Sequence, residues 1–172
     1  MNASPRAFQS LDSFSVRLLL ATLLALLRHP DQMARLREDP TLMGSAMEEL
    51  LRYDSPVQGT ARIATMESVL GGTVVHAGET LILLLGAANH DPARFADPDR
   101  LDIGRRENKH LSFAHGPHFC LGAALARLEG QIALGTLLRR CPDLQLAAEP
   151  LAWREELLLR GLHRLPVTFT SP

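Results

Sequence analysis

Residues 113–127, FAHGPHFCLGAALAR, form the stretch that decides the fold of this chain. Within it, Cys120 ends a loop rich in glycine, proline and histidine, and an apolar segment that predicts a helix follows directly. A thiol at a helix N-terminus meets unpaired backbone N–H groups and the positive end of the helix dipole, which favour the metal-binding thiolate. Gly116 and Pro117 bend the loop, and Gly122 leaves room for a flat, bulky group against the backbone. The pattern therefore predicts that Cys120 binds a metal beside such a group.

Two further features surround this cysteine. His115 and His118 place cationic side chains beside the same space. Apolar residues recur roughly on one face of the helix predicted behind the loop: Leu121, Leu125, Leu128, Ile132 and Leu138. An inert buried thiol is the alternative for a lone cysteine, and it is the commoner fate of this residue type. The loop around Cys120 favours a ligand over an inert thiol.

The same stretch closely resembles the heme-binding loop of the cytochromes P450, the heme-thiolate monooxygenases, whose pattern is F-G-x-G-x-H/R-x-C-L-G continued by x-x-L-A-R. The positions that match in register are Phe113, Gly116, His118, Cys120, Leu121, Gly122, Leu125, Ala126 and Arg127. Ala114 departs from the usual glycine, and its methyl group is expected to crowd the turn slightly. The resemblance implies that the Cys120 thiolate is the axial ligand of the iron in heme b (iron protoporphyrin IX). It also implies heme contacts from Phe113, Gly116, His118 and Gly122.

Composition fits one domain of ordinary hydrophobicity. The chain has 172 residues, of which 46% are hydrophobic, and this is enough for a modest core. The formal net charge of -1 gives no indication of nucleic acid or of an anionic membrane as a partner. The two cysteines, Cys120 and Cys141, make no disulfide framework and fit a reducing, cytoplasmic environment. Cys141 precedes Pro142 at a predicted helix end and is expected to be structural.

Residues 18–27, LLLATLLALL, form an apolar run near the N-terminus. The run is too short to cross a bilayer, which takes about 20 residues. A signal-peptide core is one interpretation, because Arg6 and Arg17 precede the run. A charged helical stretch follows it, however, in place of a small-residue cleavage site, and this favours a buried helix. Proline disfavours helical geometry just before it, so the helix is predicted to end at His29–Pro30.

Two more helices are predicted in the next part of the chain. The first begins at Asp31, with Asp31 as its cap, and is broken by Pro40. The second, SAMEELLRYDSP, is predicted to be capped by Ser45, with Glu48 completing a capping box.

The second of these helices carries Glu49 and Arg52, an ExxR pair that lies on one helix face. A solvated ion pair is the ordinary interpretation of so short a motif. Its place ahead of the cysteine loop matches the cytochromes P450, where an arginine from a later loop joins the pair, and Arg100 falls at that position. The resemblance therefore implies that Glu49, Arg52 and Arg100 form a buried structural lock beneath the heme. Arginine suits this role because its planar fork can hold a carboxylate with two hydrogen bonds.

Strands are predicted in residues 58–65 and 68–85, where β-branched and apolar residues surround a Gly71–Gly72 turn. In the family, an arginine on a strand shortly after the ExxR motif meets a heme propionate, and Arg62 fits that place. His118 would meet the other side of the heme. An exposed strand cation is the alternative for Arg62.

Two or three short strands are predicted after Pro142, in LQLA, ELLLRGLHRL and PVTF, and Trp153 is expected to pack among them. The resemblance covers residues 18–170, which is less than half of a family member. It implies a mainly α fold with small β-sheets (α+β), the C-terminal half of the cytochrome P450 fold with the N-terminal half absent. The chain, residues 1–172, is thus predicted to be one truncated heme-binding domain in which residues 1–17 are atypical.

The oxygen-activating motif of the family is missing from this sequence. The family carries an acid/alcohol pair in A-G-x-[DE]-T-[TS], which delivers protons to dioxygen. Backward alignment places this motif over residues 10–15, SLDSFS, where Phe14 takes the place of the key threonine. Ser13 and Ser15 are the nearest hydroxyl groups in the sequence. No residue of the chain is therefore assigned a catalytic role.

Three hypotheses for function follow. The first is a cytochrome P450 monooxygenase, completed by the missing half, that inserts one oxygen atom of O2 into a small organic substrate. Its electrons would come from a ferredoxin or a flavoprotein reductase. The second is a remnant that binds heme without oxygenase activity. The third is a non-functional fragment whose apolar helix faces lack their partner half.

Overall fold

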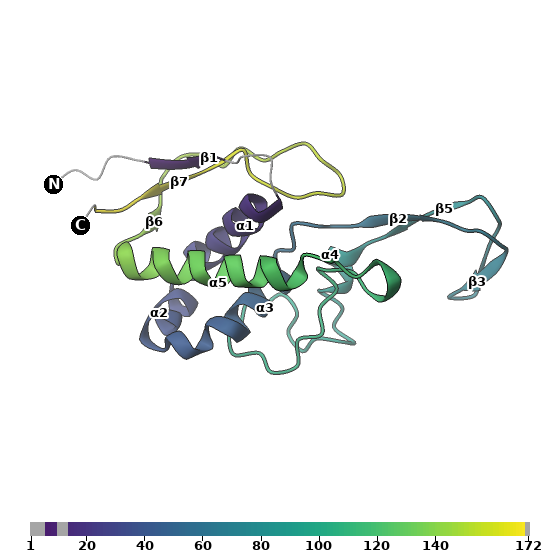
Figure 1. Cartoon of the computed structure of the whole chain (residues 1–172), viewed down its shortest axis with the longest axis horizontal. Helices are drawn as coiled ribbons and strands as arrows, with labels where there is room; N and C mark the ends of the chain where they lie inside the picture. The colour runs from purple at the N-terminus through teal and green to yellow at the C-terminus, as the bar shows by residue number, and fades with distance from the viewer. Residues whose placement is uncertain (1–5, 10–13, 171–172) are drawn as a thin grey trace.

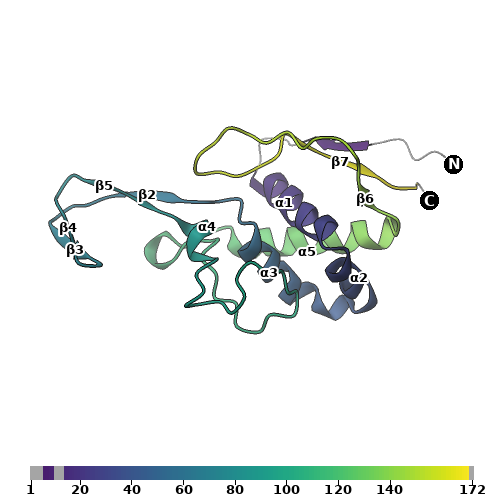
Figure 2. The ribbon, with the colours of Figure 1, turned by 180° about the vertical axis from the view of Figure 1, so that it is seen from behind.

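The fold is mainly helical with small antiparallel sheets, which confirms the predicted α+β class. The computed structural model describes residues 6–9 and 14–170 of the chain. Helices gather at one end of the molecule, and a long, narrow arm of strands extends away from them (Figure 1). The view from behind shows the same arrangement, with the arm free of the helices along its outer part (Figure 2).

Three helices meet at the centre of the molecule. They are α1 (Phe14–Arg28), α3 (Met43–Tyr53) and α5 (Ala123–Arg140), and each contacts the other two. Between Leu18 and Leu26, nearly every residue of α1 is buried, because this apolar run lies between the other two helices and the C-terminal strands. The prediction of a buried helix in residues 18–27 is therefore confirmed.

The second helix, α2 (Pro30–Glu38), begins one residue before the predicted start. His29 is its N-cap residue, and no side chain makes a capping hydrogen bond there. Pro30, at the first helical position, lacks an N–H that would be unpaired there anyway, and its fixed φ suits the start of a helix. Asp31 is an acidic residue of the first turn, and its prediction as the cap is wrong.

A 3-10 turn, η1 (Pro40–Leu42), leads without a break into α3. Ser45 lies inside α3, and its hydroxyl donates to the Leu42 carbonyl at 3.0 Å. The predicted capping box of Ser45 and Glu48 is therefore wrong. The box does not form because the preceding turn already supplies helical backbone. Helix α3 therefore begins at Met43 rather than after Ser45.

The arm consists of two antiparallel pairs. Strand β2 (Thr60–Ile63) pairs with β5 (Thr80–Leu83), and β3 (Ser68–Leu70) pairs with β4 (Thr73–Val75). The glycines of the 71–72 turn have φ angles of 55° and 84°, a region that favours glycine. The predicted hairpin at this position is thus confirmed.

A third sheet covers the helices on the side of both chain ends. Strand β7 (Arg164–Thr168) lies between β1 (Arg6–Gln9) and β6 (Gln145–Leu146), antiparallel to both. The predicted strands LQLA and PVTF overlap β6 and β7. Most of the predicted strand ELLLRGLHRL is irregular, with an isolated bridge between Trp153 and Leu162.

A long irregular segment joins α4 (Leu85–Ala88) to α5 and contains the 3-10 turn η2 (Gly116–His118). Buried apolar side chains hold this segment against the helices: Phe95, Leu101, Ile103 and Phe113. Cys141 is buried at the end of α5, as its predicted structural role requires. Within the described residues, no helix has the length and apolar character needed to cross a membrane.

Candidate functional site

A cavity of about 350 Å³ opens beside the Cys120 thiol. Residues from α1, β2, α4 and the cysteine loop line it: Phe14, Val57, Thr60, Arg62, Leu85, Ser112, Phe113, Ala114, His118 and Cys120. The structure thus brings Arg62, Phe113, His118 and Cys120 to one place, although Arg62 is far from the others in sequence. The two glycines predicted to contact the heme, Gly116 and Gly122, lie in the same loop but do not line this cavity.

Cys120 lies shortly before α5, which begins at Ala123 and not at Leu121 as the sequence predicts. Its backbone N–H donates to the Phe113 carbonyl at 2.9 Å, and its carbonyl accepts from the Ala123 N–H at 3.2 Å. Gly122 is the N-cap residue of α5, and a Cβ added to it would meet only the Cys120 Sγ, at 3.9 Å. The thiol is partly exposed. The backbone beside the sulfur therefore leaves an open approach for a flat group.

The turn before the cysteine contains one strained residue. Ala114 has a φ of 60°, in the left-handed region, and Gly116 follows with a φ of 69°. A non-glycine residue in this region loses roughly 1–2 kcal/mol to the contact between its Cβ and the following carbonyl oxygen. The position where the sequence departs from the family pattern is thus the one where the backbone favours glycine.

Arg62 places a cation at the edge of the cavity. Its Nη1 donates to the Thr60 Oγ1 at 3.0 Å and to the Ala61 carbonyl at 2.7 Å. These bonds fix the guanidinium along β2 and leave it without a carboxylate partner among the described residues. His118 lies on the cysteine loop at the same cavity. Two basic side chains therefore border the space in front of the thiol.

A second cavity, of about 330 Å³, adjoins the first. The two share Thr60, Arg62, Leu85 and Ala114, and the second extends along β5 past Leu83 and Leu84 to His115. Apolar side chains supply most of both walls. Together the cavities offer a thiol, apolar walls and cations at the border, which are the features that hold a flat, largely apolar ring with acidic substituents.

Phe14 lines the cavity at the position where the sequence alignment places the family's threonine. It is an apolar side chain and offers no hydroxyl. Ser13, one of the two hydroxyl groups considered from the sequence, lies outside the described residues, and Ser15 is described but does not line the cavity. The two hydroxyl groups that do line the cavity belong to Thr60 and Ser112.

Beneath the cysteine loop, Glu49 and Arg52 form a fully buried ion pair. The Arg52 Nε donates to the Glu49 Oε2 at 2.8 Å, and its Nη2 donates to the Oε1 at 2.9 Å. The two Nη1 hydrogens reach the backbone carbonyls of Asn89 and Pro98, both at 2.8 Å. A buried pair of this kind requires every hydrogen bond to be made, and here the long loop supplies them.

The arginine that joins this pair is Arg105, and the prediction of Arg100 is corrected. The Arg105 Nε lies 3.1 and 3.0 Å from the two Glu49 carboxylate oxygens. Arg100 contributes only its backbone carbonyl, which accepts from Arg52 and Arg105 at 3.3 and 3.2 Å. The loop turns between the two arginines, at Asp102, whose N–H donates to the Glu49 Oε1 at 3.0 Å. This turn directs Arg105 inward.

The sequence did not indicate three residues that complete this network, two asparagines and one serine. The Asn108 Nδ2 donates to the Glu49 Oε2 at 3.0 Å. Buried Asn89 accepts from the Leu111 N–H at 2.7 Å and donates to the Ser112 Oγ at 2.9 Å. The Ser112 hydroxyl in turn donates to a carbonyl of α3 at 2.7 Å. Asn89 belongs to the segment AANHDP, whose turn-forming residues were the available signal.

Glu48 ties α3 to α5 directly under Phe113. Arg127 holds its carboxylate with two hydrogen bonds, at 2.7 and 2.9 Å, and the His110 Nε2 lies 3.2 Å from the same group. The Arg127 guanidinium also lies 4.6 Å from the centre of the Phe113 ring. Burial raises the pKa of Glu48, but hydrogen bonds from His110 and Arg127 outweigh it and lower this pKa from 4.5 to about 2.

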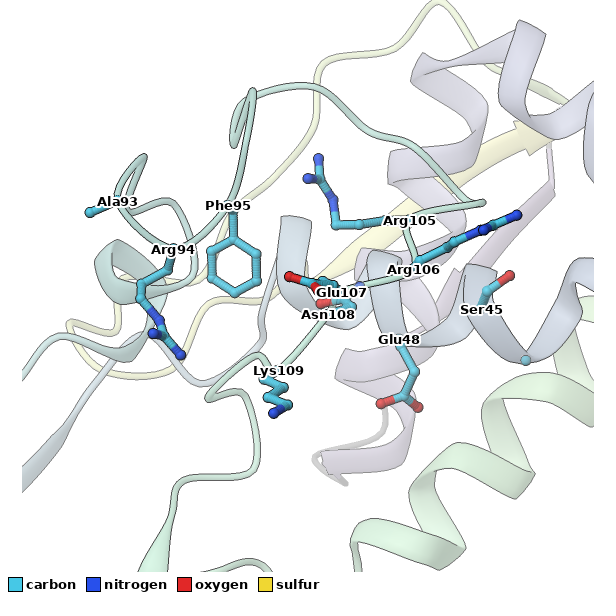
Figure 3. Close-up of a pocket in the computed structure, with 11 residues that line it drawn as sticks. Ser45, Glu48, Ala93, Arg94, Phe95, Arg105, Arg106, Glu107, Asn108 and Lys109 are labelled. Atoms are coloured by element: carbon cyan, nitrogen blue, oxygen red, sulfur yellow. The ribbon is translucent and has the colours of Figure 1, made fainter.

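A larger pocket, of about 730 Å³, lies on the other side of Glu48 (Figure 3). Its walls come from the start of α3 and from the long loop: Gly44, Ser45, Glu48, Ala93, Arg94, Phe95, Arg105, Arg106, Glu107, Asn108 and Lys109. It shares no lining residue with the cavity at Cys120. Its size alone does not make it the cofactor site, because neither the thiol nor Arg62 reaches it.

Comparison with known proteins gives a consistent result. The sequence model of the family described as Cytochrome P450 matches residues 17–147. The chain is 52% identical over 155 residues to the biotin biosynthesis cytochrome P450 of Bacillus subtilis (strain 168), covering 90% of this chain and 39% of that protein. It is 49% identical over 156 residues to cytochrome P450 monooxygenase PikC of Streptomyces venezuelae, covering 89% of this chain and 38% of that protein.

Solved structures resemble the fold to the same extent. The crystal structure of P450BioI in complex with hexadec-9Z-enoic acid ligated acyl carrier protein superposes with a TM-score of 0.88 at 51% identity. That match covers 91% of this chain and 41% of that structure. The Bacillus subtilis 168 bacillaene polyketide synthase cytochrome P450 PksS gives 0.89 at 44% identity, with 92% and 42% coverage. The chain thus spans about two fifths of the length of the relatives it matches.

Proposed function

The chain belongs to the cytochrome P450 family, and from this premise we propose that it binds heme b through the thiolate of Cys120. The observation that carries the proposal is the convergence of Cys120, Arg62 and His118 on one apolar cavity. Arg62 comes from β2 and the other two from the cysteine loop, so only the fold brings them together.

Each residue has a distinct part in holding the cofactor. Cys120 would supply the sulfur ligand to the heme iron, and the bond from its N–H to the Phe113 carbonyl fixes the backbone that carries it. Arg62 and His118 would pair with the acidic substituents of the ring. Phe113 packs against the loop from beneath, where Arg127 supports it. Gly116, with a φ of 69°, permits the turn before the cysteine, and Gly122 leaves space beside the sulfur, where an added Cβ would meet only the Cys120 Sγ.

The hydrogen-bond network around Glu49 fixes the position of the cysteine loop relative to the helices. Arg52 and Arg105 hold the carboxylate, and their remaining donors reach backbone carbonyls along residues 89–100. Because these bonds are buried, the loop has few alternative positions. We assign these residues a positioning role with no part in the chemistry.

Thiolate-ligated heme supplies dioxygen activation, in which one oxygen atom is inserted into an organic substrate. Among the longer relatives, one is named as a monooxygenase and another as a hydroxylase, which supports the same class of reaction here. We propose a small organic substrate, a ferredoxin or flavoprotein reductase as the electron donor, and a cytoplasmic setting. Of these, the substrate would contact mostly the part of the family fold that this chain does not span.

A heme-binding protein without oxygenase activity is the second candidate, and the Phe14 position favours it. No Asp or Glu is among the described residues that line the cavity. Its two hydroxyl groups already have partners: Thr60 accepts from Arg62, and Ser112 donates to Leu51. Among the residues described here, proton delivery to dioxygen therefore has no side chain to carry it. We expect the chain alone to bind heme and not to oxygenate.

Heme titration of the purified chain tests the proposal. With hemin under reducing conditions and carbon monoxide, we expect the red-shifted Soret band of a thiolate ligand. Cys120→Ala should abolish that band, whereas the matched variant Cys141→Ala, at the other end of α5, should retain it. Retention of the band in Cys120→Ala would refute the assignment of the ligand. A well-folded chain that binds no hemin would refute heme binding itself.

A further inference from the structure

The pocket on the far side of Glu48 takes no part in the proposed heme site (Figure 3). Its volume of about 730 Å³ falls in the range of roughly 300–1,000 Å³ in which proteins hold small organic ligands. A single inorganic anion would leave most of this space empty. The pocket therefore has room for an organic molecule.

Three basic side chains of the pocket wall have no partner in the part of the chain that the structure describes. Arg94, Arg106 and Lys109 are exposed, and none of their side chains makes a hydrogen bond or an ion pair there. Figure 3 shows Arg94 and Lys109 toward one side of the view and Arg106 toward the other, with Phe95 between them. These cations are available to a ligand.

The other charged groups of the wall are engaged by the protein, with one exception. Arg105 directs its guanidinium to the Glu49 carboxylate and to three backbone carbonyls. Glu48 is held by two basic side chains outside the pocket. Only Glu107 remains as a free carboxylate among the described residues of the wall, so its one negative charge faces three positive charges. An excess of positive charge in a pocket attracts an anionic ligand.

A hydrogen-bond acceptor in the same wall is unsatisfied. The Asn108 Nδ2 donates to the Glu49 Oε2 at 3.0 Å, and this bond fixes the orientation of the amide. The Asn108 Oδ1 is buried and has no partner among the described residues. An unpaired buried oxygen is unfavourable until a donor reaches it. A ligand that carries hydroxyl groups beside its anionic group would supply that donor.

We propose that this pocket binds a phosphorylated sugar, either free or as part of a nucleotide. The planar fork of an arginine matches the oxygens of a phosphate, and a lysine adds a compact charge. Arg94 and Lys109 would hold the phosphate, and the sugar hydroxyls would reach the wall that contains Asn108. An acidic protein is the other partner that exposed cations attract. The depth of a pocket lined by both α3 and the long loop favours the small ligand over that partner.

Calorimetric titration of the full chain in phosphate-free buffer tests the proposal, with ADP and ribose 5-phosphate as probes. We expect at least one of them to bind one-to-one with a Kd below about 1 mM. The double variant Arg94→Gln and Lys109→Gln should weaken this binding at least about tenfold, because it removes both charge-assisted contacts. Arg139→Gln with Arg140→Gln removes the same charge from exposed positions at the end of α5 and should leave binding unchanged.

A pocket-filling variant separates the pocket from its charged rim. A Cβ added to Gly44 would meet nothing within 4 Å, so Gly44→Leu adds bulk to the wall without a clash. We expect it also to weaken binding at least about tenfold, with circular dichroism as the check of folding. Cys120→Ala should bind the probe unchanged, because the two cavities share no lining residue. Failure here would therefore leave the heme assignment untouched.

Four results would overturn the proposal. Neither compound binds, or adenosine and ribose bind as tightly as their phosphorylated forms. Inorganic phosphate alone binds as tightly as both probes, which would reduce the pocket to a simple anion site. Polyglutamate binds where neither compound does, which would assign the three cations to an acidic protein instead.

Discussion

The two sides of the cysteine loop differ in how far their side chains are buried and their polar groups hydrogen-bonded. Beneath the loop, the Glu49 carboxylate receives hydrogen bonds from two arginines, an asparagine and a backbone N–H, and it is fully buried. Above the loop, Cys120 is partly exposed and Leu121 fully so. The lower side satisfies its own polar groups, whereas the upper side presents a thiol, cations and apolar residues to the exterior.

The arm and the outward side of α5, where Leu125, Leu128 and Ile132 are exposed, also present apolar residues to the exterior. Several large apolar residues of the arm are exposed: Ile63, Met66, Val69, Leu70, Val74, Ile82, Leu83 and Leu84. Two-stranded pairs are marginal on their own, because a hairpin needs further strands or a helix to bury one face. The comparison indicates that the buried network around Glu49, beneath the cysteine loop, stabilises this chain. The side above the loop leaves apolar residues exposed. Changes below should therefore affect folding, and changes above should affect binding.

The largest effect is expected from Arg105→Ala, which removes one arginine from the lower side. Glu49 would keep Arg52 and Asn108 but would lose two contacts at 3.0 and 3.1 Å, and three backbone carbonyls would lose a donor. We expect a loss of about 2–3 kcal/mol in the free energy of unfolding, measured by urea denaturation.

Arg100→Ala is the matched control for this prediction. Only the backbone carbonyl of Arg100 enters the network, and alanine retains that carbonyl. The expected change is within about 0.5 kcal/mol. A greater loss for Arg100→Ala than for Arg105→Ala would restore the original prediction from sequence and contradict the network described here.

The second effect is a pH dependence that arises at Glu48. Its pKa is lowered from 4.5 to about 2, so the folded state binds this proton less readily than the unfolded chain does. The resulting stability is fully present above pH 4.5 and is lost as the pH falls toward 2. Because Glu48 is partly exposed and screened by solvent, its contribution is about 1–2 kcal/mol.

Urea denaturation at a series of pH values measures this contribution. In Glu48→Gln the part of the acid sensitivity that Glu48 contributes should disappear, and the variant should be less stable than the unsubstituted chain at pH 7. If the difference between the two proteins were the same at pH 3 and pH 7, the bonds from Arg127 and His110 would not be the source of the lowered pKa.

Sequence reasoning reached the residues whose chemistry follows from a local motif. The ExxR pair and the cysteine loop are each set by short spacings along one element, and the structure places both as a helix face and a loop–helix junction. The sequence could not show whether Arg100 or Arg105 contacts Glu49. Both are arginines of one irregular loop, and only the turn at Asp102 decides which side chain points inward.

Helix α5 illustrates a second limit. Periodicity grouped Leu125, Leu128 and Leu138 on one apolar face, but Leu125 and Leu128 are exposed and only Leu138 is buried in the core. The core instead uses the smaller face around Ala126 and Gly130, where a Cβ on Gly130 would lie 2.6 Å from the Met47 sulfur. Close contact between two helices favours small residues at the interface, whereas a search for hydrophobic periodicity finds the large apolar residues. A helix with two apolar faces therefore cannot be oriented from its pattern alone.

The smallest expected effect concerns the upper side and tests whether its strain is intrinsic to the backbone. Ala114 lies in the left-handed region, with a φ of 60°, and it lines both cavities near Cys120. Ala114→Gly would relieve the Cβ contact but would also give the unfolded chain more conformations, so we expect a net gain of about 0.5–1 kcal/mol. Urea denaturation measures it, with Ala124→Gly, exposed in the first turn of α5, as the control that should destabilise by about 1 kcal/mol. Equal losses for the two variants would mean that the loop at residue 114 carries no strain and that its alanine is as well suited to the turn as glycine.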